Sequence, residues 1–169
     1  MRTHLDARDA GATSNFSLTV GDWVTVGEGA RVVREAVFVQ EQGIAREDEW
    51  DEADATAVHA VVTTTQGEPV ATGRLLNAHD QGAGTARIGR MAVLPVWRDA
   101  GLGLWVVQAL EQAAQARGDQ RVVLSAQRSA EGFYLRLGYT PYGEPFDEVG
   151  IPHLHMQRVL AAAPTEPAR

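Results

Sequence analysis

The segment from Ile88 to Leu110 constrains the fold of this chain more than any other. It begins with a short apolar run that stops at Pro95, a residue with no amide hydrogen to give to a sheet. After a turn that contains Gly101 and Gly103, apolar residues recur at the spacing of one helix face. They are Leu102, Trp105, Val106, Ala109, Leu110 and Ala113. The segment therefore predicts a strand, a glycine-containing turn and a helix in direct succession.

This succession predicts an anion site at the start of the helix. The first amides of a helix have no acceptor within it, and the helix dipole favours negative charge at that end. Glycines in the turn let a ligand approach the backbone closely. We therefore expect the turn to bind a phosphate group.

The spacing of the glycines narrows the choice of ligand. The third glycine of a dinucleotide-binding G-x-G-x-x-G is missing, no acidic residue follows at the ribose-binding distance, and the chain contains no G-x-x-x-x-G-K-[ST]. The stretch from Arg98 to Gly103 does match R/Q-x-x-G-x-G/A. In its strand and helix context it resembles the coenzyme A pyrophosphate loop of the GNAT superfamily of acyl-CoA-dependent N-acyltransferases. An ordinary strand-to-helix turn is the alternative.

Other parts of the chain extend this resemblance. Eight separated segments occur in an order similar to that of the ElaA-like subfamily, and the resemblance covers roughly residues 18–159. The segments are Val37–Gln42, Asp51–Asp54, Val58–Ala60, Ile88–Gly103, Leu124–Gln127, Phe133–Gly138, Gly143–Phe146 and Gly150–His153.

The order of the expected elements is strand, helix, three strands, helix, strand, helix and two strands, which predicts an α/β domain with a mixed sheet. The resemblance adds the GNAT fold, in which a mixed six- to seven-stranded sheet is flanked by helices and has a splayed central cleft. We expect a single domain at residues 16–160 between flexible tails at 1–15 and 161–169.

Some boundaries follow from local signals. A glycine break at residues 27–29 predicts that the first helix covers residues 30–39. Ser129 is expected to cap a short helix. The last two strands are predicted at residues 139–143 and 153–160, joined by a loop at 144–152.

The composition limits the kinds of binding partner that we expect. A net charge of −7 argues against nucleic acid and suits a cationic substrate. The absence of cysteine excludes disulfides, a thiolate nucleophile and a cysteine zinc site, and we expect no metal. No apolar run is long enough to span a membrane, and residues 1–14 lack a signal-peptide pattern. We expect a cytoplasmic protein that binds no membrane, with a homodimer left open.

The resemblance implies acetyl-CoA as cofactor and a small-molecule or peptide amine as acceptor. The amides of Asp99 to Leu104 would hold the pyrophosphate, the Met91–Val93 backbone would pair with pantetheine and polarise the carbonyl, and Gln127 would lie along the pantetheine arm. Asp99 and Ala100 occupy positions that the loop of the resembling family often fills with basic residues or glycine. The expected cofactor contacts are Met91, Ala92, Val93, Arg98, Asp99, Ala100, Gly101, Leu102, Gly103, Leu104, Gln127 and Tyr134.

The resemblance also indicates catalytic residues. Tyr134 is the expected general acid, since a neutral tyrosine can donate a proton, although it could instead pack in the core. Glu41 and then His153 are the candidate bases, ahead of Glu144 and Glu148, and a chain of waters could replace them.

Two further alternatives remain open. The acid-rich segment from Glu41 to Asp54 is either a solvated loop or a surface that attracts ammonium groups. The protein itself is expected to move an acetyl group from acetyl-CoA to a primary amine by direct transfer. It could instead be a non-catalytic acyl-CoA-binding or regulatory module, or a nucleotide-binding protein that uses Gly101 to Gly103.

Overall fold

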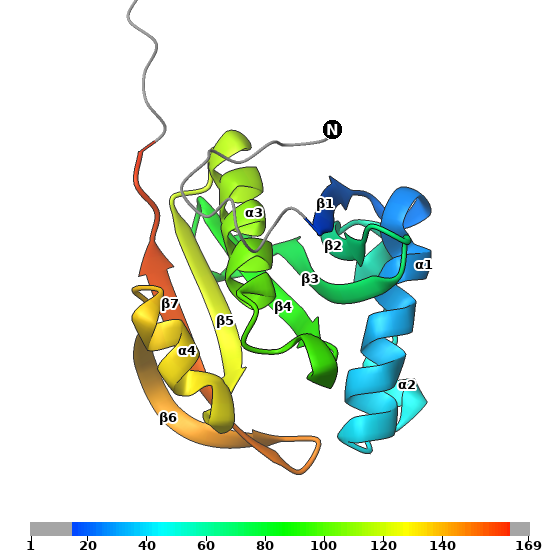
Figure 1. The fold of residues 1–169 in the computed structure, drawn as a ribbon. Coiled ribbons are helices and arrows are strands. Elements are labelled where there is room, and N and C mark those ends of the chain that lie inside the picture. Colours follow the sequence, from blue (N-terminus) through cyan, green and yellow to red (C-terminus); the bar gives the residue numbers. More distant parts are fainter. Residues whose placement is uncertain (1–14, 163–169) are drawn as a thin grey trace, which may run out of the picture. The chain divides into compact units, whose positions relative to one another are not determined.

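A computed structural model describes residues 15–162 (Figure 1). Its helices and strands follow the predicted order, with several short helical segments added in the connections. The strands are β1 (Phe16–Gly21), β2 (Val58–Thr64), β3 (Pro69–Asn77), β4 (Thr85–Val93), β5 (Arg121–Gln127), β6 (Thr140–Glu148) and β7 (Ile151–Val159). The helices are α1 (Trp23–Arg34), the π-helical η1 (Glu35–Glu41), α2 (Arg46–Glu49), α3 (Leu102–Ala116) and α4 (Glu131–Arg136), with 3-10 turns η2 (Glu52–Ala55), η3 (His79–Gln81), η4 (Pro95–Trp97) and η5 (Arg128–Ala130).

The strands form one seven-stranded sheet in the order β1-β2-β3-β4-β5-β7-β6. The pairs β1–β2, β2–β3, β5–β7 and β6–β7 are antiparallel, whereas β4 and β5 are parallel. The parallel ladder joins Thr85–Arg87 to Arg121–Val123, at the beginning of both strands. The predicted mixed sheet is therefore confirmed.

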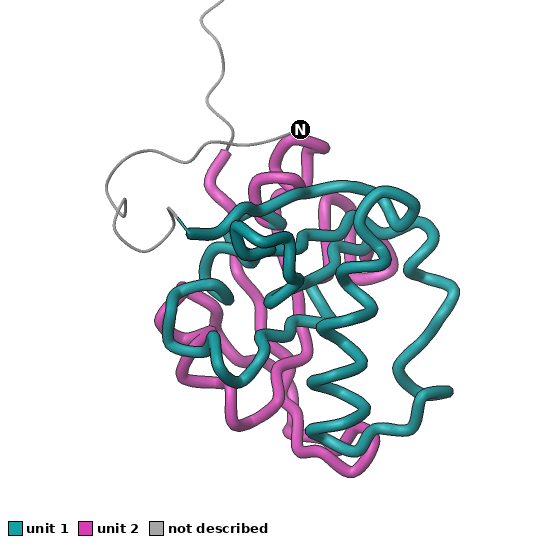
Figure 2. Tube along the Cα trace, turned by 45° about the vertical axis from the view of Figure 1, so that its right-hand side comes forward, with its two compact units in different colours: residues 1–76, 88–110 teal, residues 77–87, 111–169 magenta. Residues whose placement is uncertain are grey.

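The chain divides into two compact units (Figure 2). The first contains the chain up to Leu76 together with Ile88–Leu110, and the second contains Asn77–Arg87 and the chain from Glu111 onward. The boundaries fall before the last residue of β3 and inside β4 and α3.

In the first unit, helix α1 begins at Trp23, so the prediction of a start at residue 30 is wrong. The Asp22 carboxylate caps the helix by accepting a hydrogen bond from the Thr25 amide at 2.9 Å. Gly27 and Gly29 lie inside the helix, at positions where neighbouring side chains come too close to the backbone for a larger residue. A Cβ atom at Gly27 would lie 2.7 Å from the Trp23 ring, and one at Gly29 would lie 3.0 Å from Val61. These glycines therefore permit close packing instead of a turn.

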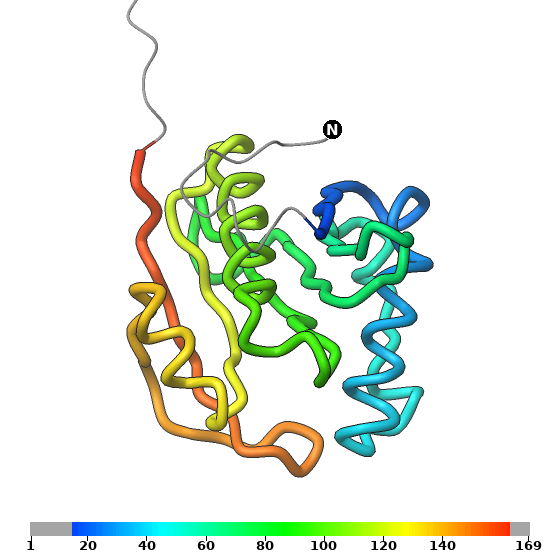
Figure 3. Tube along the Cα trace, viewed as in Figure 1, coloured from blue at the N-terminus to red at the C-terminus, as the bar shows by residue number. Residues whose placement is uncertain are grey.

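Helix α1 continues without a break into η1 (Figure 3). The wider π-helical turn appears in the hydrogen bond from the Gln42 amide to the Val37 carbonyl oxygen, at 3.0 Å. Val37 and Phe38 are buried and form one apolar cluster with Val33 and with Ala92 of β4. This packing places the end of η1 against the end of β4.

The second unit ends in a long hairpin. Two predictions are wrong in this unit, one about the hairpin and one about helix α4. Strand β6 continues to Glu148, so the turn is short and contains Val149 and Gly150 instead of a loop over 144–152. Ala130, not Ser129, occupies the N-cap of α4, and no side chain caps this helix. The expected tails lie mostly outside the described residues.

The hairpin turn generates a prediction about stability. Val149 has φ 46° and Gly150 has φ 76°, a pair of left-handed residues in which a branched side chain is unfavourable and asparagine is preferred. Val149 is 51% exposed, so it contributes little packing. We expect Val149→Asn to raise the free energy of unfolding by about 1 kcal/mol. Urea titration checks this, with Val24→Asn on the exposed face of α1 as a control, and an unchanged or lower stability would contradict it.

Candidate active site

The first unit contains a buried network of ion pairs. Arg34 of α1, which is 1% exposed, donates through Nε to Glu49 Oε1 at 2.7 Å and through Nη1 to Asp54 Oδ1 at 2.8 Å. Arg74 of β3 donates through Nη1 to Asp51 Oδ1 at 2.7 Å and to Asp54 Oδ1 at 3.0 Å. Asp54 is thus shared by two arginines. Charges this deeply buried are stable in a protein only when paired in this way.

A third arginine joins the network from β4. Arg90 donates through Nη2 to Asp51 Oδ2 at 3.2 Å, and its Nε lies 3.3 Å from Glu49 Oε1. Its Nε and Nη2 also donate to the Glu49 carbonyl oxygen at 3.3 and 3.1 Å. Burial raises the pKa of Glu49, whereas the hydrogen bond from Arg74 lowers the pKa of Asp51.

This network decides part of the open question about the acid-rich segment. Glu49, Asp51 and Asp54 are each bonded to arginines, so their charges are compensated inside the protein. Their role is structural, which neither of the two alternatives anticipated. Five acids of this segment are exposed: Asp51 and Glu41, which are paired with arginines, and Glu47, Asp48 and Glu52.

His59 of β2 belongs to the same buried region. It is 1% exposed, its Nε2 lies 3.0 Å from the Asp54 carbonyl oxygen, and its ring centre lies 4.8 Å from that of Trp23. Burial lowers its pKa, so the ring is neutral at pH 7. His59 is therefore packed and hydrogen-bonded in the interior.

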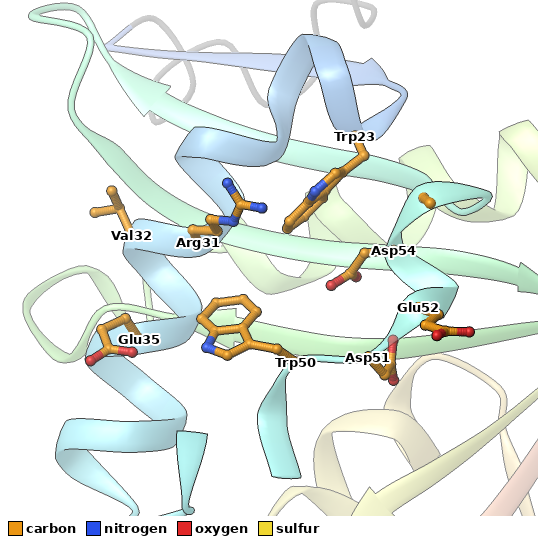
Figure 4. Close-up of a pocket in the computed structure, with 9 residues that line it drawn as sticks. Trp23, Arg31, Val32, Glu35, Trp50, Asp51, Glu52 and Asp54 are labelled. Atoms are coloured by element: carbon orange, nitrogen blue, oxygen red, sulfur yellow. The ribbon is translucent and has the colours of Figure 1, made fainter. Parts of the chain in front are cut away.

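A hollow of about 640 Å³ opens beside this network (Figure 4). Trp23 and Trp50 form its walls, and the Arg34 guanidinium carbon lies 5.6 Å and 4.6 Å from the centres of their rings. Asp51 and Asp54 reach the hollow from η2 and the residue before it. Because both carboxylates are already bonded to arginines, the hollow offers a ligand mainly indole surface.

The predicted anion turn lies between β4 and α3. Asp99 has φ 66° and is exposed, and Gly101 has φ 79°. No atom lies within 4 Å of the place where a Cβ of Gly101 would stand, so the backbone faces open space there. The first hydrogen bond of the helix runs from Trp105 N to Gly101 O at 3.1 Å, which leaves the amides of residues 102–104 without an intrahelical acceptor.

Arg98 and Glu41 form a two-pronged ion pair within the first unit. Arg98 Nη1 and Nη2 donate to the two Glu41 oxygens at 2.8 and 2.7 Å, and its Nε donates to the Val93 carbonyl oxygen at 3.0 Å. The arginine thus ties the end of η1 to the end of β4. Its hydrogen bonds lower the pKa of Glu41, which keeps that carboxylate ionised at neutral pH.

Tyr134 lies on α4 in the second unit and is 7% exposed. Its ring makes edge-on contacts with Phe133 and Tyr139 at centroid distances of 5.0 and 5.7 Å. Burial raises the pKa of Tyr134, so its hydroxyl keeps its proton throughout the neutral range. Tyr139 differs, because its hydroxyl donates to Glu111 Oε1 at 2.8 Å.

His153 lies on β7 of the second unit, in register with Gln127 of β5. Its Nδ1–H donates to the Ile151 carbonyl oxygen at 2.6 Å, which leaves Nε2 of the neutral ring without a hydrogen. Glu148 Oε2 lies 3.7 Å from that Nε2. The side chain is therefore oriented with its unprotonated nitrogen near a carboxylate.

The sequence prediction did not find the arginines of the buried network. Arg34 and Arg90 both stand in mostly apolar stretches, next to Val33 and Met91 respectively, and Arg74 lies within a strand. A charged residue at a core position is the available signal, since such residues are buried only with partners. The partners themselves could not be identified, because they lie 15 to 41 residues away in the chain.

Comparison with known proteins identifies the class of protein. The profile of the Acetyltransferase (GNAT) domain matches residues 28–160. The chain therefore belongs to the GNAT acetyltransferase family, and its predicted fold is confirmed.

Individual relatives agree with this assignment. The chain is 39% identical over 127 residues to the uncharacterized N-acetyltransferase YjcF of Bacillus subtilis (strain 168), covering 75% of this chain and 87% of that protein. Its fold is similar to that of Escherichia coli ElaA, with a TM-score of 0.74, 27% identity, and coverage of 85% of this chain and 99% of that one. An acyl-CoA N-acyltransferase from Pseudomonas aeruginosa gives a TM-score of 0.73 at 28% identity, with coverage of 85% and 99%. The ElaA-like resemblance is confirmed.

Within residues 15–162, no helix is both long and apolar enough to cross a membrane. The same residues contain no group of three or more potential metal ligands placed to hold an ion.

The buried network generates a prediction. Arg34→Met keeps most of the side-chain volume but leaves Glu49 without its shortest ion pair and Asp54 with one arginine fewer. Because removing one partner of a buried ion pair leaves a charge uncompensated, we expect a loss of about 3–5 kcal/mol in the free energy of unfolding. Urea denaturation measures it. Arg46→Met, at the exposed ion pair with Glu35, is the control and should change stability little. Equal effects of the two substitutions would contradict the proposed importance of burial.

Proposed function

We propose that this protein transfers an acetyl group from acetyl-CoA to a primary amine by direct transfer. The observation that carries the proposal is the turn from Asp99 to Leu104, whose backbone faces open space at Gly101 and whose helix amides are free to bind an anion. Membership of the GNAT acetyltransferase family supports the same reaction class.

The residues at the turn fit a pyrophosphate. The amides of Leu102, Gly103 and Leu104 would donate to it, and the helix dipole of α3 would add to the attraction. The Met91–Val93 backbone would bind the pantetheine arm by strand-like hydrogen bonds, with Gln127 as a further contact. Arg98 braces the turn through Glu41 and Val93. The bound cofactor supplies an activated acyl thioester.

Two proton transfers accompany the proposed reaction. The acceptor enters as an ammonium and must lose a proton before it forms the new N–C bond. His153 Nε2, which carries no hydrogen in the neutral ring, would accept that proton. The ionised Glu41 would attract and orient the ammonium, or take its proton through a water. Tyr134 would donate its hydroxyl proton to the leaving sulfur as the C–S bond breaks.

A screen of primary amines with acetyl-CoA, read as free thiol release, tests the reaction. Calorimetric titration of the wild-type protein with CoA, ATP and NAD runs beside it. Thiol release that requires an amine supports the proposal. CoA binding without turnover on any amine would make the protein an acyl-CoA-binding module, and preference for ATP or NAD would make it a nucleotide-binding protein.

The charge of Asp99 generates a prediction about cofactor affinity. Asparagine tolerates the left-handed backbone as well as aspartate does, so Asp99→Asn removes a negative charge without adding strain. We expect CoA to bind about threefold more tightly at low salt, as for two unit charges about 7 Å apart in water. The gain should shrink as salt is added. Glu28→Gln on the exposed surface of α1 is the control, and calorimetry measures both variants. Unchanged CoA affinity at low salt would contradict a pyrophosphate site at this turn.

Tyr134 separates an enzyme from a binding protein. Tyr134→Phe keeps the ring contacts with Phe133 and Tyr139 and removes the hydroxyl proton. We expect kcat to fall by about 10²-fold, the lower end for general acid catalysis, because a phenol with a raised pKa is a weak acid and a thiolate is already a fair leaving group. CoA affinity should be unchanged.

The control for this substitution is Tyr142→Phe, which removes the hydroxyl of a β6 tyrosine that stacks on His155. Its kcat should equal that of the wild type. Wild-type kcat in Tyr134→Phe, with chemistry shown to limit the rate, would reduce Tyr134 to a packing residue. Joint loss of CoA binding would make it a cofactor contact.

A further inference from the structure

Strand β4 contains a left-handed residue in its interior. Arg90 has φ 49°, and it is the one non-glycine residue with positive φ inside a strand of the described chain. For a residue with a Cβ this conformation is unfavourable compared with extended backbone, and it persists only where surrounding contacts impose it. Arg90 immediately precedes Met91–Val93.

The contacts that impose it come from the acid-rich segment. The Arg90 guanidinium makes hydrogen bonds or ion pairs with the Glu49 carbonyl oxygen, the Glu49 carboxylate and the Asp51 carboxylate, at 3.1 to 3.3 Å. Glu49 and Asp51 are themselves fixed by Arg34 and Arg74. The side chain therefore ends in a rigid set of acceptors, and the backbone at residue 90 must follow it.

The residues after Arg90 are held from the other side as well. Ala92 is buried against Val33, Val37 and Phe38 of α1 and η1. The Leu94 amide donates to the Val70 carbonyl oxygen of β3 at 2.9 Å. With position 90 fixed on one side and positions 92 and 94 on the other, the direction of the Met91 amide is determined.

We propose that Arg90 is a positioning residue, whose ion pairs with Glu49 and Asp51 hold the left-handed backbone at position 90 and thereby direct the Met91 amide. This inference rests on the proposed function, since Met91–Val93 is the stretch that would bind the acyl donor and polarise its carbonyl. Arg90 itself acts only through the backbone. Glu49 and Asp51 of the acid-rich segment would then serve the reaction without touching the substrate.

The fold should survive replacement of Arg90. If Arg90 is removed, Glu49 still has Arg34 at 2.7 Å and Asp51 still has Arg74 at 2.7 Å. No buried carboxylate is then left without a partner. Removal of Arg34 differs, because it takes away the shortest ion pair of the buried Glu49 and one of the two arginines that share the buried Asp54.

Glycine and alanine at position 90 form a matched pair of variants. Both lack the guanidinium, but glycine adopts positive φ without steric cost whereas alanine does not. We expect Arg90→Gly to keep kcat within about threefold of the wild type, and Arg90→Ala to lower it by about tenfold, the population shift that corresponds to the left-handed cost. Thermal unfolding of the two variants should differ little.

Two readouts do not depend on turnover. Crystal structures of the variants should show positive φ at residue 90 for glycine and extended backbone for alanine. In protein labelled with ¹⁵N-methionine, acetyl-CoA should shift the Met91 amide in the wild type and in Arg90→Gly, and much less in Arg90→Ala. Met156 of β7 provides an internal reference within the same spectrum.

The outcomes separate this inference from the proposed function. If wild-type protein neither binds acetyl-CoA nor releases thiol, the proposed function fails, and the crystal structures still decide whether Arg90 holds the backbone. If Arg90→Ala keeps positive φ, or if both variants lose activity equally, the side chain does not act by holding the backbone and the inference is overturned.

Discussion

The buried ion pairs around Asp54 are the interaction on which the first unit depends. Asp54 is shared by Arg34 of α1 and Arg74 of β3, so one carboxylate joins a helix to a strand in the interior. Such a network gains little stability over an apolar core, but it is specific, because each charge has only one arrangement of partners that satisfies it. We therefore regard it as a device that fixes the positions of η2, α1 and β3 relative to one another.

The network also explains how an acid-rich segment can serve a site that binds an anionic cofactor. Carboxylates near a pyrophosphate would be expected to repel it. In this chain Glu49, Asp51 and Asp54 are compensated by arginines, and Glu41 is compensated by Arg98. The local charge of these groups is close to balanced, so the net charge of −7 does not by itself argue against acetyl-CoA.

The features predicted correctly from the sequence are local ones. The strand, turn and helix of this stretch follow from residues within a span of 23 positions, Ile88 to Leu110, where a proline, two glycines and a helical spacing act together. The wrong predictions concern features that depend on distant residues. Gly27 and Gly29 suggested a break because only the fold reveals that Trp23 and Val61 press on them. The ion pairs of Arg34, Arg74 and Arg90 likewise join positions far apart in the chain, and no local pattern specifies them.

Two arginines flank the backbone that would bind the acyl donor. Arg90 precedes Met91–Val93 and is held by Glu49 and Asp51, while Arg98 follows it and joins the Val93 carbonyl oxygen to Glu41. Both sets of carboxylates come from the one acid-rich segment, Glu41 to Asp54. Preorganised backbone donors stabilise developing charge only when their direction is fixed before the reaction begins. A segment that anchors the Met91–Val93 stretch on both sides provides that fixation, which gives its acidic residues a physical role that does not require contact with the acceptor amine.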